Sequence, residues 1–159
     1  MAEKDPIRPT DDQARTLART LLDEARWAAL STLDETGHPS VSLASFALDD
    51  DRKPVLLVSA LSSHTSQLRK DPRCALLIGE PGKGDPLAHP RVTISCTAEF
   101  ITRPGTENDR LRPLYLKRQP KAELYIDFGD FTFVKLTPIA ASLNGGFGKA
   151  YRLTPDDLR

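Results

Sequence analysis

The strongest constraint on the fold is a series of short apolar segments separated by turn residues. The stretch 92–98 alternates apolar and polar residues, which is typical of a strand with one buried face. Similar segments occur at 28–33, 41–46, 55–58, 74–78, 131–135 and 139–143. Tight-turn sequences between several of these segments favour antiparallel neighbours. Closing six or seven such strands on themselves removes exposed edges, so the sequence predicts a mostly β protein built on a closed or nearly closed antiparallel barrel.

Helical signals flank these strands. Apolar residues at helical spacing predict a helix over about 11–25, and Thr10 with Gln13 is typical of the capping box that opens one. Further helices are expected at 62–70 and 106–118, and Thr154 with Pro155 opens a short terminal segment. We interpret residues 1–10 as a disordered tail and 11–159 as a single domain.

Composition narrows the possible functions. The 22 basic and 22 acidic residues cancel, so the chain has no overall field that would hold duplex nucleic acid. Two cysteines cannot form a disulfide framework, and three histidines lie far apart in sequence, so we expect no metal site. No apolar run reaches the roughly 18 residues of a membrane span, and the N-terminus does not read as a signal peptide. A cytoplasmic protein is expected.

The segment from Ser62 to Ser66 is the most informative candidate site. Four hydroxyls and an imidazole open a helix directly after a buried strand. A helix N-terminus offers unpaired N–H groups and the positive end of the helix dipole, which favours a phosphate. Arg69, Lys70 and Arg73 follow and would raise the local potential. The alternative is that a serine merely caps the helix.

Two other stretches leave alternatives open. The basic run from Arg110 to Lys121 is either a solvated helix face or a surface for an anionic ligand or a partner subunit. Three glycines around Phe147, followed by Lys149, form either a plain flexible turn or part of a site.

The motifs together resemble a known family. The stretches ALSTLDETGHPSVSLASF and LLVSALSSHTSQLRKDPRCALL resemble the pyridoxamine 5′-phosphate oxidase-like FMN-binding split-barrel proteins. The later DFGDFTFVKLTP and LNGGFGKAY are similar to the branch that includes haem-utilisation proteins. The resemblance covers most of the chain.

This resemblance implies a six-stranded antiparallel split β-barrel that forms a homodimer with two FMN sites at the subunit interface. The flavin ring would lie along Ser42, Leu43 and Ala44, and Ser59 would face the same ligand. The FMN phosphate would lie against the helix start, and Arg91 and a partner's Lys149 would complete the site. The implied phosphate residues are Ser62, Ser63, His64 and Thr65.

The resemblance leads us to expect an FMN-dependent oxidoreductase, whose flavin would carry the redox chemistry. The alternative is a non-catalytic protein that binds or stores flavin or haem. In the related oxidase, Arg and Lys stand where this chain has His64 and Thr65, so weaker FMN binding is expected unless Arg69 or Arg73 compensates. Haem-degrading relatives carry a C-terminal region beyond the position of Arg159, so haem degradation is not expected.

Overall fold

The computed structural model describes residues 5–159, and its strands form one sheet in the order β1-β8-β7-β4-β3-β2-β5-β6. A further pairing between β7 and β6 closes six of these strands into a barrel, because β7 is hydrogen-bonded to β4, β6 and β8. The six-stranded antiparallel split barrel is thereby confirmed. The strands are β1 (Ile7–Arg8), β2 (Trp27–Leu33), β3 (Pro39–Leu48), β4 (Pro54–Ser59), β5 (Arg73–Ile78), β6 (Arg91–Phe100), β7 (Phe131–Asn144) and β8 (Ala150–Leu153).

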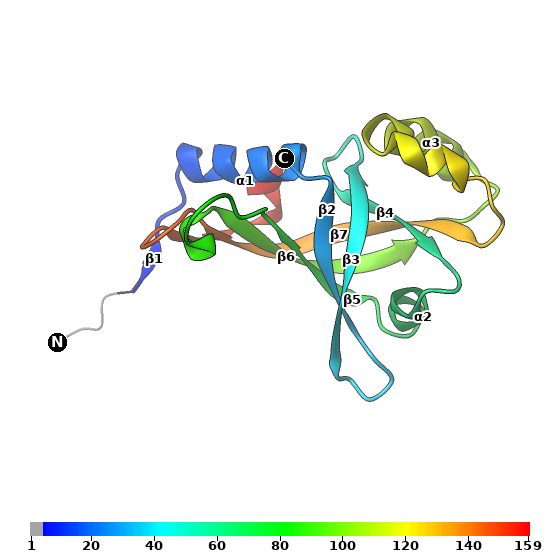
Figure 1. Cartoon of the computed structure of the whole chain (residues 1–159), viewed down its shortest axis with the longest axis horizontal. Coiled ribbons are helices and arrows are strands. Elements are labelled where there is room, and N and C mark those ends of the chain that lie inside the picture. Colours follow the sequence, from blue (N-terminus) through cyan, green and yellow to red (C-terminus); the bar gives the residue numbers. More distant parts are fainter. Residues whose placement is uncertain (1–4) are drawn as a thin grey trace.

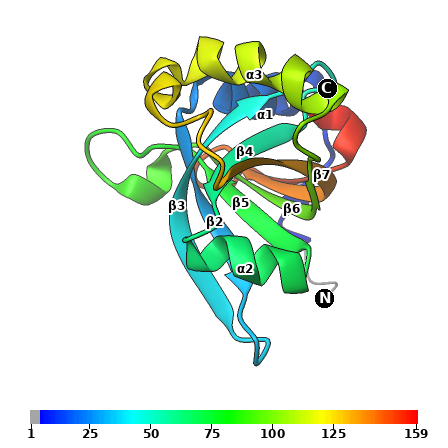
Figure 2. The same cartoon turned by 90° about the vertical axis from the view of Figure 1, so that its right-hand side faces the viewer.

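Helices cover the barrel on several sides (Figure 1). Helix α1 (Asp12–Glu24) lies along the extended arm formed by β6, β7 and β8, and α3 (Thr106–Arg118) lies over one end of the barrel. Helix α2 (Ser63–Lys70) runs beneath the barrel, on the opposite side from α3 (Figure 2). All three helices were predicted within one residue at each end.

The start of α1 differs from the prediction. Asp11, not Thr10, occupies the N-cap and accepts the N–H of Ala14 at 2.8 Å. The Thr10 hydroxyl instead donates to the carbonyl of Arg152 in β8 at 2.7 Å. The proposed capping box with Gln13 is therefore wrong, because a tertiary contact uses the threonine hydroxyl.

Two strands, β1 and β7, also differ from expectation. Ile7–Arg8 pairs in parallel with β8, although residues 1–10 were interpreted as a disordered tail; residues 1–4 lie outside the described part. The segments predicted at 131–135 and 139–143 form one strand, β7. A register shift opposite Ser95 and Cys96 lets this strand pass Pro138, which has no N–H to donate.

Two apolar clusters hold the layers together. The larger fills the barrel and the underside of α1, with Leu30, Phe46, Leu76 and Val134 all fully buried. The smaller lies under α3, where the rings of Tyr115 and Phe133 pack at 5.6 Å between centroids. Arg118, at the end of α3, joins the two clusters. Its guanidinium donates to the carbonyls of Leu22 and Ala25 at the end of α1 and lies over the Phe46 ring at 4.8 Å.

A buried ion pair ties the β3–β4 turn to β7. One Asp49 carboxylate oxygen accepts the backbone N–H groups of Asp51 and Lys53, and the other lies 3.3 Å from the Lys135 ammonium. Lys135 also donates to Glu107 of α3 at 2.6 Å. Hydrogen bonds from Arg110 and Lys135 lower the pKa of Glu107 to about 2. Lys135 is therefore the cation that compensates a carboxylate with almost no solvent exposure.

Lys135→Met should lower the free energy of unfolding by about 3 kcal/mol, because it leaves the buried Asp49 carboxylate without its counter-ion. Urea unfolding followed by circular dichroism measures this loss. As a control, Arg73→Met removes the exposed partner of Asp71 and should cost less than about 1 kcal/mol. Equal small losses in the two variants would contradict a stabilising role for the buried pair.

Candidate functional site

Strand β3 is paired with a different neighbour in each part of its length. It pairs with β2 over residues 39–45 and with β4 over residues 46–48 only. Over residues 39–45, before this pairing begins, β3 and β4 diverge, and this divergence is the split in the barrel. One edge of β3 is consequently left without a neighbouring strand.

The pairing fixes which backbone groups face this open edge. Across the β3–β4 turn, the N–H of Asp49 donates to the carbonyl of Lys53 at 2.9 Å. Since backbone groups alternate in direction along a strand, the odd-numbered residues of β3 direct their N–H and C=O toward the β4 side. The backbone groups of Val41, Leu43 and Ser45 therefore point into the split, where a ligand can bond them as a strand would.

The N-terminus of α2 lies beside this edge. His64 Nδ1 is 3.3 Å from the hydroxyl oxygen of Ser42, the residue between two of the open-edge positions. Burial lowers the pKa of His64 below its ordinary value of 6.5, so the imidazole is neutral at pH 7. Because Nδ1 is next to Ser42, Nε2 is the ring nitrogen left to meet a ligand.

Two of the four hydroxyls between Ser62 and Ser66 already make hydrogen bonds. Thr65 donates to the carbonyl of Ser59 at 2.6 Å, and Ser66 donates to the carbonyl of Ser63 at 2.9 Å. Ser62 occupies the N-cap position of α2, but its side chain makes no capping hydrogen bond. Within the described residues, Ser62 and Ser63 are therefore the hydroxyls of this segment that have no side-chain partner.

The Ser59 hydroxyl also has hydrogen-bond partners already, and one of them, Asp130, was not identified from the sequence. Its hydroxyl donates to Asp130 at 3.0 Å and accepts the N–H of Leu61 at 3.2 Å. Asp130 comes from the loop before β7, about 70 positions along the chain. No sequence signal links the two residues, because only the closure of the barrel by β7 brings that loop beside β4.

The cations expected to support a phosphate lie elsewhere. Arg69, Lys70 and Arg73 belong to the other end of α2 or follow it, and each has its own partner. Arg69 stacks on the Phe100 ring at 4.0 Å, Lys70 pairs with Glu35, and Arg73 pairs with Asp71 at 2.7 Å. Of the two alternatives, weaker FMN binding or compensation by Arg69 or Arg73, these contacts do not favour compensation.

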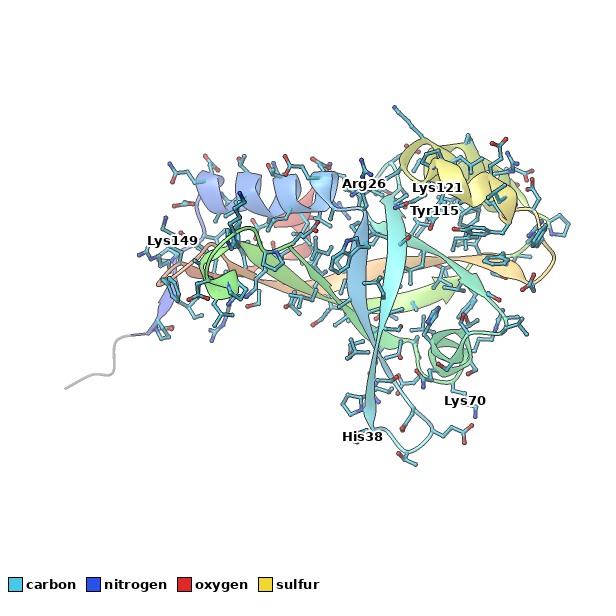
Figure 3. All side chains as sticks on the ribbon, viewed as in Figure 1. Arg26, His38, Lys70, Tyr115, Lys121 and Lys149 are labelled. Atoms are coloured by element: carbon cyan, nitrogen blue, oxygen red, sulfur yellow. The ribbon has the colours of Figure 1, made fainter. Side chains whose placement is uncertain are left out.

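Two predicted site residues lie far from α2 within the chain. Lys149 is at the end of the β7–β8 arm, opposite the end that carries Lys70 (Figure 3). Arg91 lies on the same arm, where it pairs with Asn144 and donates to the carbonyls of Leu87 and His89. One chain thus brings Ser42, Ser59 and residues 62–65 together, whereas Arg91 and Lys149 could join them only from a second chain.

The basic run is mainly a structural feature. Arg110 pairs with Glu107 and Asp50, Arg112 pairs with Asp127, and Arg118 binds the end of α1.

The two cysteines face each other across β5 and β6, and burial raises the pKa of Cys74 to about 11. A thiol with so high a pKa is a poor nucleophile.

The outer face of the barrel is apolar and uncovered. Ala29 of β2 lies opposite Leu43 of β3 and Leu77 of β5, so these side chains share one face. Leu43 and Val41 are 68% and 69% exposed, and the single tryptophan, Trp27, is 41% exposed at the rim. A cleft of about 380 Å³ opens beside Trp27, and its charged lining residues are Glu24, Arg26 and Glu80.

The fold and the site thus define a split-barrel protein with an open strand edge beside a neutral histidine. The family model described as pyridoxamine 5′-phosphate oxidase matches residues 15–144, and the chain belongs to this family. Within the described residues, no helix is long and apolar enough to cross a membrane.

Named relatives of this chain refer to haem. It is 33% identical, over 84% of its length, to the "Non-canonical heme oxygenase HOZ, chloroplastic" of Arabidopsis thaliana, and 26% identical, over 85%, to "Heme oxygenase HutZ" of Vibrio cholerae. A solved heme binding protein from Mycobacterium smegmatis is 32% identical over 96% of the chain, with a TM-score of 0.83. The chain spans 40% of the plant protein, 78% of the Vibrio protein and 61% of the mycobacterial one.

These relatives correct the functional expectation. The branch related to haem-utilisation proteins is confirmed, but the expectation of an FMN-dependent oxidoreductase is wrong, because the named relatives are described by haem and none of the three by flavin. Of the two functions considered from the sequence, the alternative of a flavin- or haem-binding protein agrees better with them.

The lowered pKa of His64 predicts a pH effect on stability. Below its ordinary pKa of 6.5 the unfolded state binds the proton more readily than the folded state, so stability falls as the pH falls. His64→Gln should lose less stability than the wild type between pH 7.5 and pH 5. Urea unfolding at both pH values measures this difference, and identical losses in the two proteins would contradict a desolvated His64.

Proposed function

We propose that this protein binds haem in the split between β3 and α2. The observation that carries the proposal is the placement of His64, a neutral imidazole with Nε2 available, beside an open strand edge. Neutral imidazole is a common iron ligand, and a hydrogen-bond partner on its second nitrogen fixes the orientation of the ring. The haem-related names of three relatives support the choice of ligand.

The residues around the split fit a flat, largely apolar group. His64 would hold the iron, and Ser42 would orient the imidazole through Nδ1. The backbone N–H groups of Val41, Leu43 and Ser45 would donate to the propionate carboxylates of the haem. Bound haem supplies an iron centre that can be stored or can react with oxygen.

FMN is the competing ligand, as the resemblance to FMN-binding split-barrel proteins implied. The free hydroxyls of Ser62 and Ser63 would face its phosphate. The electrostatics of this segment do not favour FMN, because Arg69, Lys70 and Arg73 each contact another side chain.

A cytoplasmic location stays a prediction that cell fractionation would test.

We also propose that the outer apolar face is covered by a second copy of the chain. Val41, Leu43 and Leu77 form an exposed apolar patch on a sheet whose other face is the barrel core. A soluble monomer rarely exposes a contiguous patch of this kind, and a self-complementary dimer would bury it. Such a dimer would also allow Arg91 and Lys149 of one chain to approach the split of the other.

Haem binding gives the direct test. Purified protein titrated with haemin should develop a Soret band and lose the fluorescence of its single tryptophan, Trp27. His64→Ala should weaken binding by at least about tenfold and change the position of the Soret band. The matched control is His38→Ala, which removes an exposed histidine at the tip of the β2–β3 hairpin and should bind as the wild type does.

Three results would contradict this assignment. They are wild-type protein that binds FMN but not haemin, an unchanged spectrum in His64→Ala, or an equal loss in His38→Ala. The first would favour the flavin ligand, and the other two would move the iron site away from α2.

The dimer has its own test. Leu43→Glu places a charge in the centre of the outer face and should convert the dimer to a monomer, because an unpaired charge cannot be buried there without a large cost. Light scattering coupled to size exclusion measures the mass. Leu124→Glu, which alters an equally exposed leucine near the end of α3, should remain dimeric. A monomeric wild type would contradict the shared interface.

A further inference from the structure

A negative charge lies beside Ser59, the residue that the family resemblance expected to face the ligand. The Asp130 carboxylate accepts the hydroxyl proton of Ser59 at 3.0 Å. A serine hydroxyl has one proton, so Ser59 has none left to donate to a ligand. The same oxygen already accepts the N–H of Leu61. Ser59, which was expected to face the ligand, therefore donates to the Asp130 carboxylate and accepts from the backbone of its own loop.

Asp130 is held in this place by the backbone around it. The N–H of Ala60 donates to the Asp130 carbonyl at 2.8 Å, which joins the loop before β7 to the end of β4. The Arg103 guanidinium donates to the carbonyls of Ile126, Asp127, Phe128 and Phe131 and so organises the same loop. Asp130 itself is exposed, but its backbone position is fixed by these contacts.

The carboxylate lies close enough to act on an anion at α2. Ser62 N–H donates to the Ser59 carbonyl, so residues 59–62 form one tight turn that leads into the helix. Because a turn keeps the Cα atoms of residues 59 and 62 within about 7 Å of each other, an anion held by the Ser62 hydroxyl would lie on the order of 10 Å from the Asp130 carboxylate. Within residues 5–159, Asp130 is in no ion pair, and Arg103 binds carbonyls of the loop rather than this carboxylate.

We propose that Asp130 is a specificity-determining residue that disfavours phosphorylated ligands in the split. This inference rests on the proposed ligand site and narrows its ligand class. A carboxylate near a phosphate dianion is repulsive, and the nearby cations do not offset it, so a ligand without a phosphate is favoured at this place. Asp130 acts on the choice of ligand and has no part in any reaction.

The test compares FMN with riboflavin, which has the same ring system but no phosphate. Asp130→Asn keeps the shape of the side chain and removes its charge. It should tighten FMN binding about threefold at low ionic strength, as expected for removing one like charge about 10 Å from a dianion in water. Riboflavin affinity should change by less than about twofold. Fluorescence titration of each flavin, at the same salt concentration, gives both dissociation constants.

Asp127→Asn is the matched control. Asp127 is an exposed acid of the same loop, and its carboxylate is bound by Arg112 on the side of α3. The change in net charge is identical, and the two variants differ in position and in the exposed Arg112 pair that Asp127→Asn removes. Asp127→Asn should leave the ratio of FMN affinity to riboflavin affinity unchanged. Asp130→Ala serves as a second variant and should raise this ratio as Asp130→Asn does.

Three results would overturn the inference. They are an unchanged affinity ratio in both Asp130 variants, an equal rise in Asp127→Asn, or FMN binding that stays undetectable in every variant. Haemin titration of the same proteins keeps the two proposals apart. Wild-type protein that fails to bind haemin contradicts the proposed function, whereas the FMN-to-riboflavin ratio still decides the role of Asp130.

Discussion

The incomplete pairing of β3 is the constraint from which the rest of the site follows. A barrel closed all round would satisfy every strand and leave no edge for a ligand. Here the buried Asp49 turn keeps β3 and β4 together at one end, and β2 holds β3 along the other. The strand is thus rigid although one of its edges is free. Helix α2 lies beside that edge and provides the histidine, so the site combines a fixed backbone with a single polarisable side chain.

Charge placement decides which ligands this edge suits. Lys70 pairs with Glu35, and Arg73 pairs with Asp71. Arg69 stacks on the Phe100 ring. The Ser59 hydroxyl donates to the Asp130 carboxylate. The helix start is therefore less positive than its sequence indicates, although the helix dipole remains. A neutral imidazole with a hydroxyl partner is well prepared for a metal-centred ligand.

The sequence predicted the architecture well because strand periodicity and tight turns are local signals. The core strands followed from these signals. Local helix signals likewise predicted the helices at 12–24, 63–70 and 106–118. Four features depended on distant residues and were missed: the short strand at Ile7–Arg8, the final strand β8, the joining of two predicted strands into β7, and Asp130 beside Ser59. The Ser62–Ser66 segment was found, but its electrostatics were overestimated, since side-chain pairing cannot be read from proximity in sequence.

The position of β7 in the chain has a consequence for how the protein is made. This strand pairs with β4 about 80 residues upstream and also closes the barrel against β6. During synthesis the earlier strands therefore leave the ribosome before their closing neighbour exists, and their edges wait unpaired until residue 144 has emerged. Barrel closure is then a late step with a large loop entropy, which makes this a slow-folding topology for its size. Early termination would leave an open sheet, which is an aggregation-prone species, so the integrity of the last thirty residues governs the solubility of all that precede them.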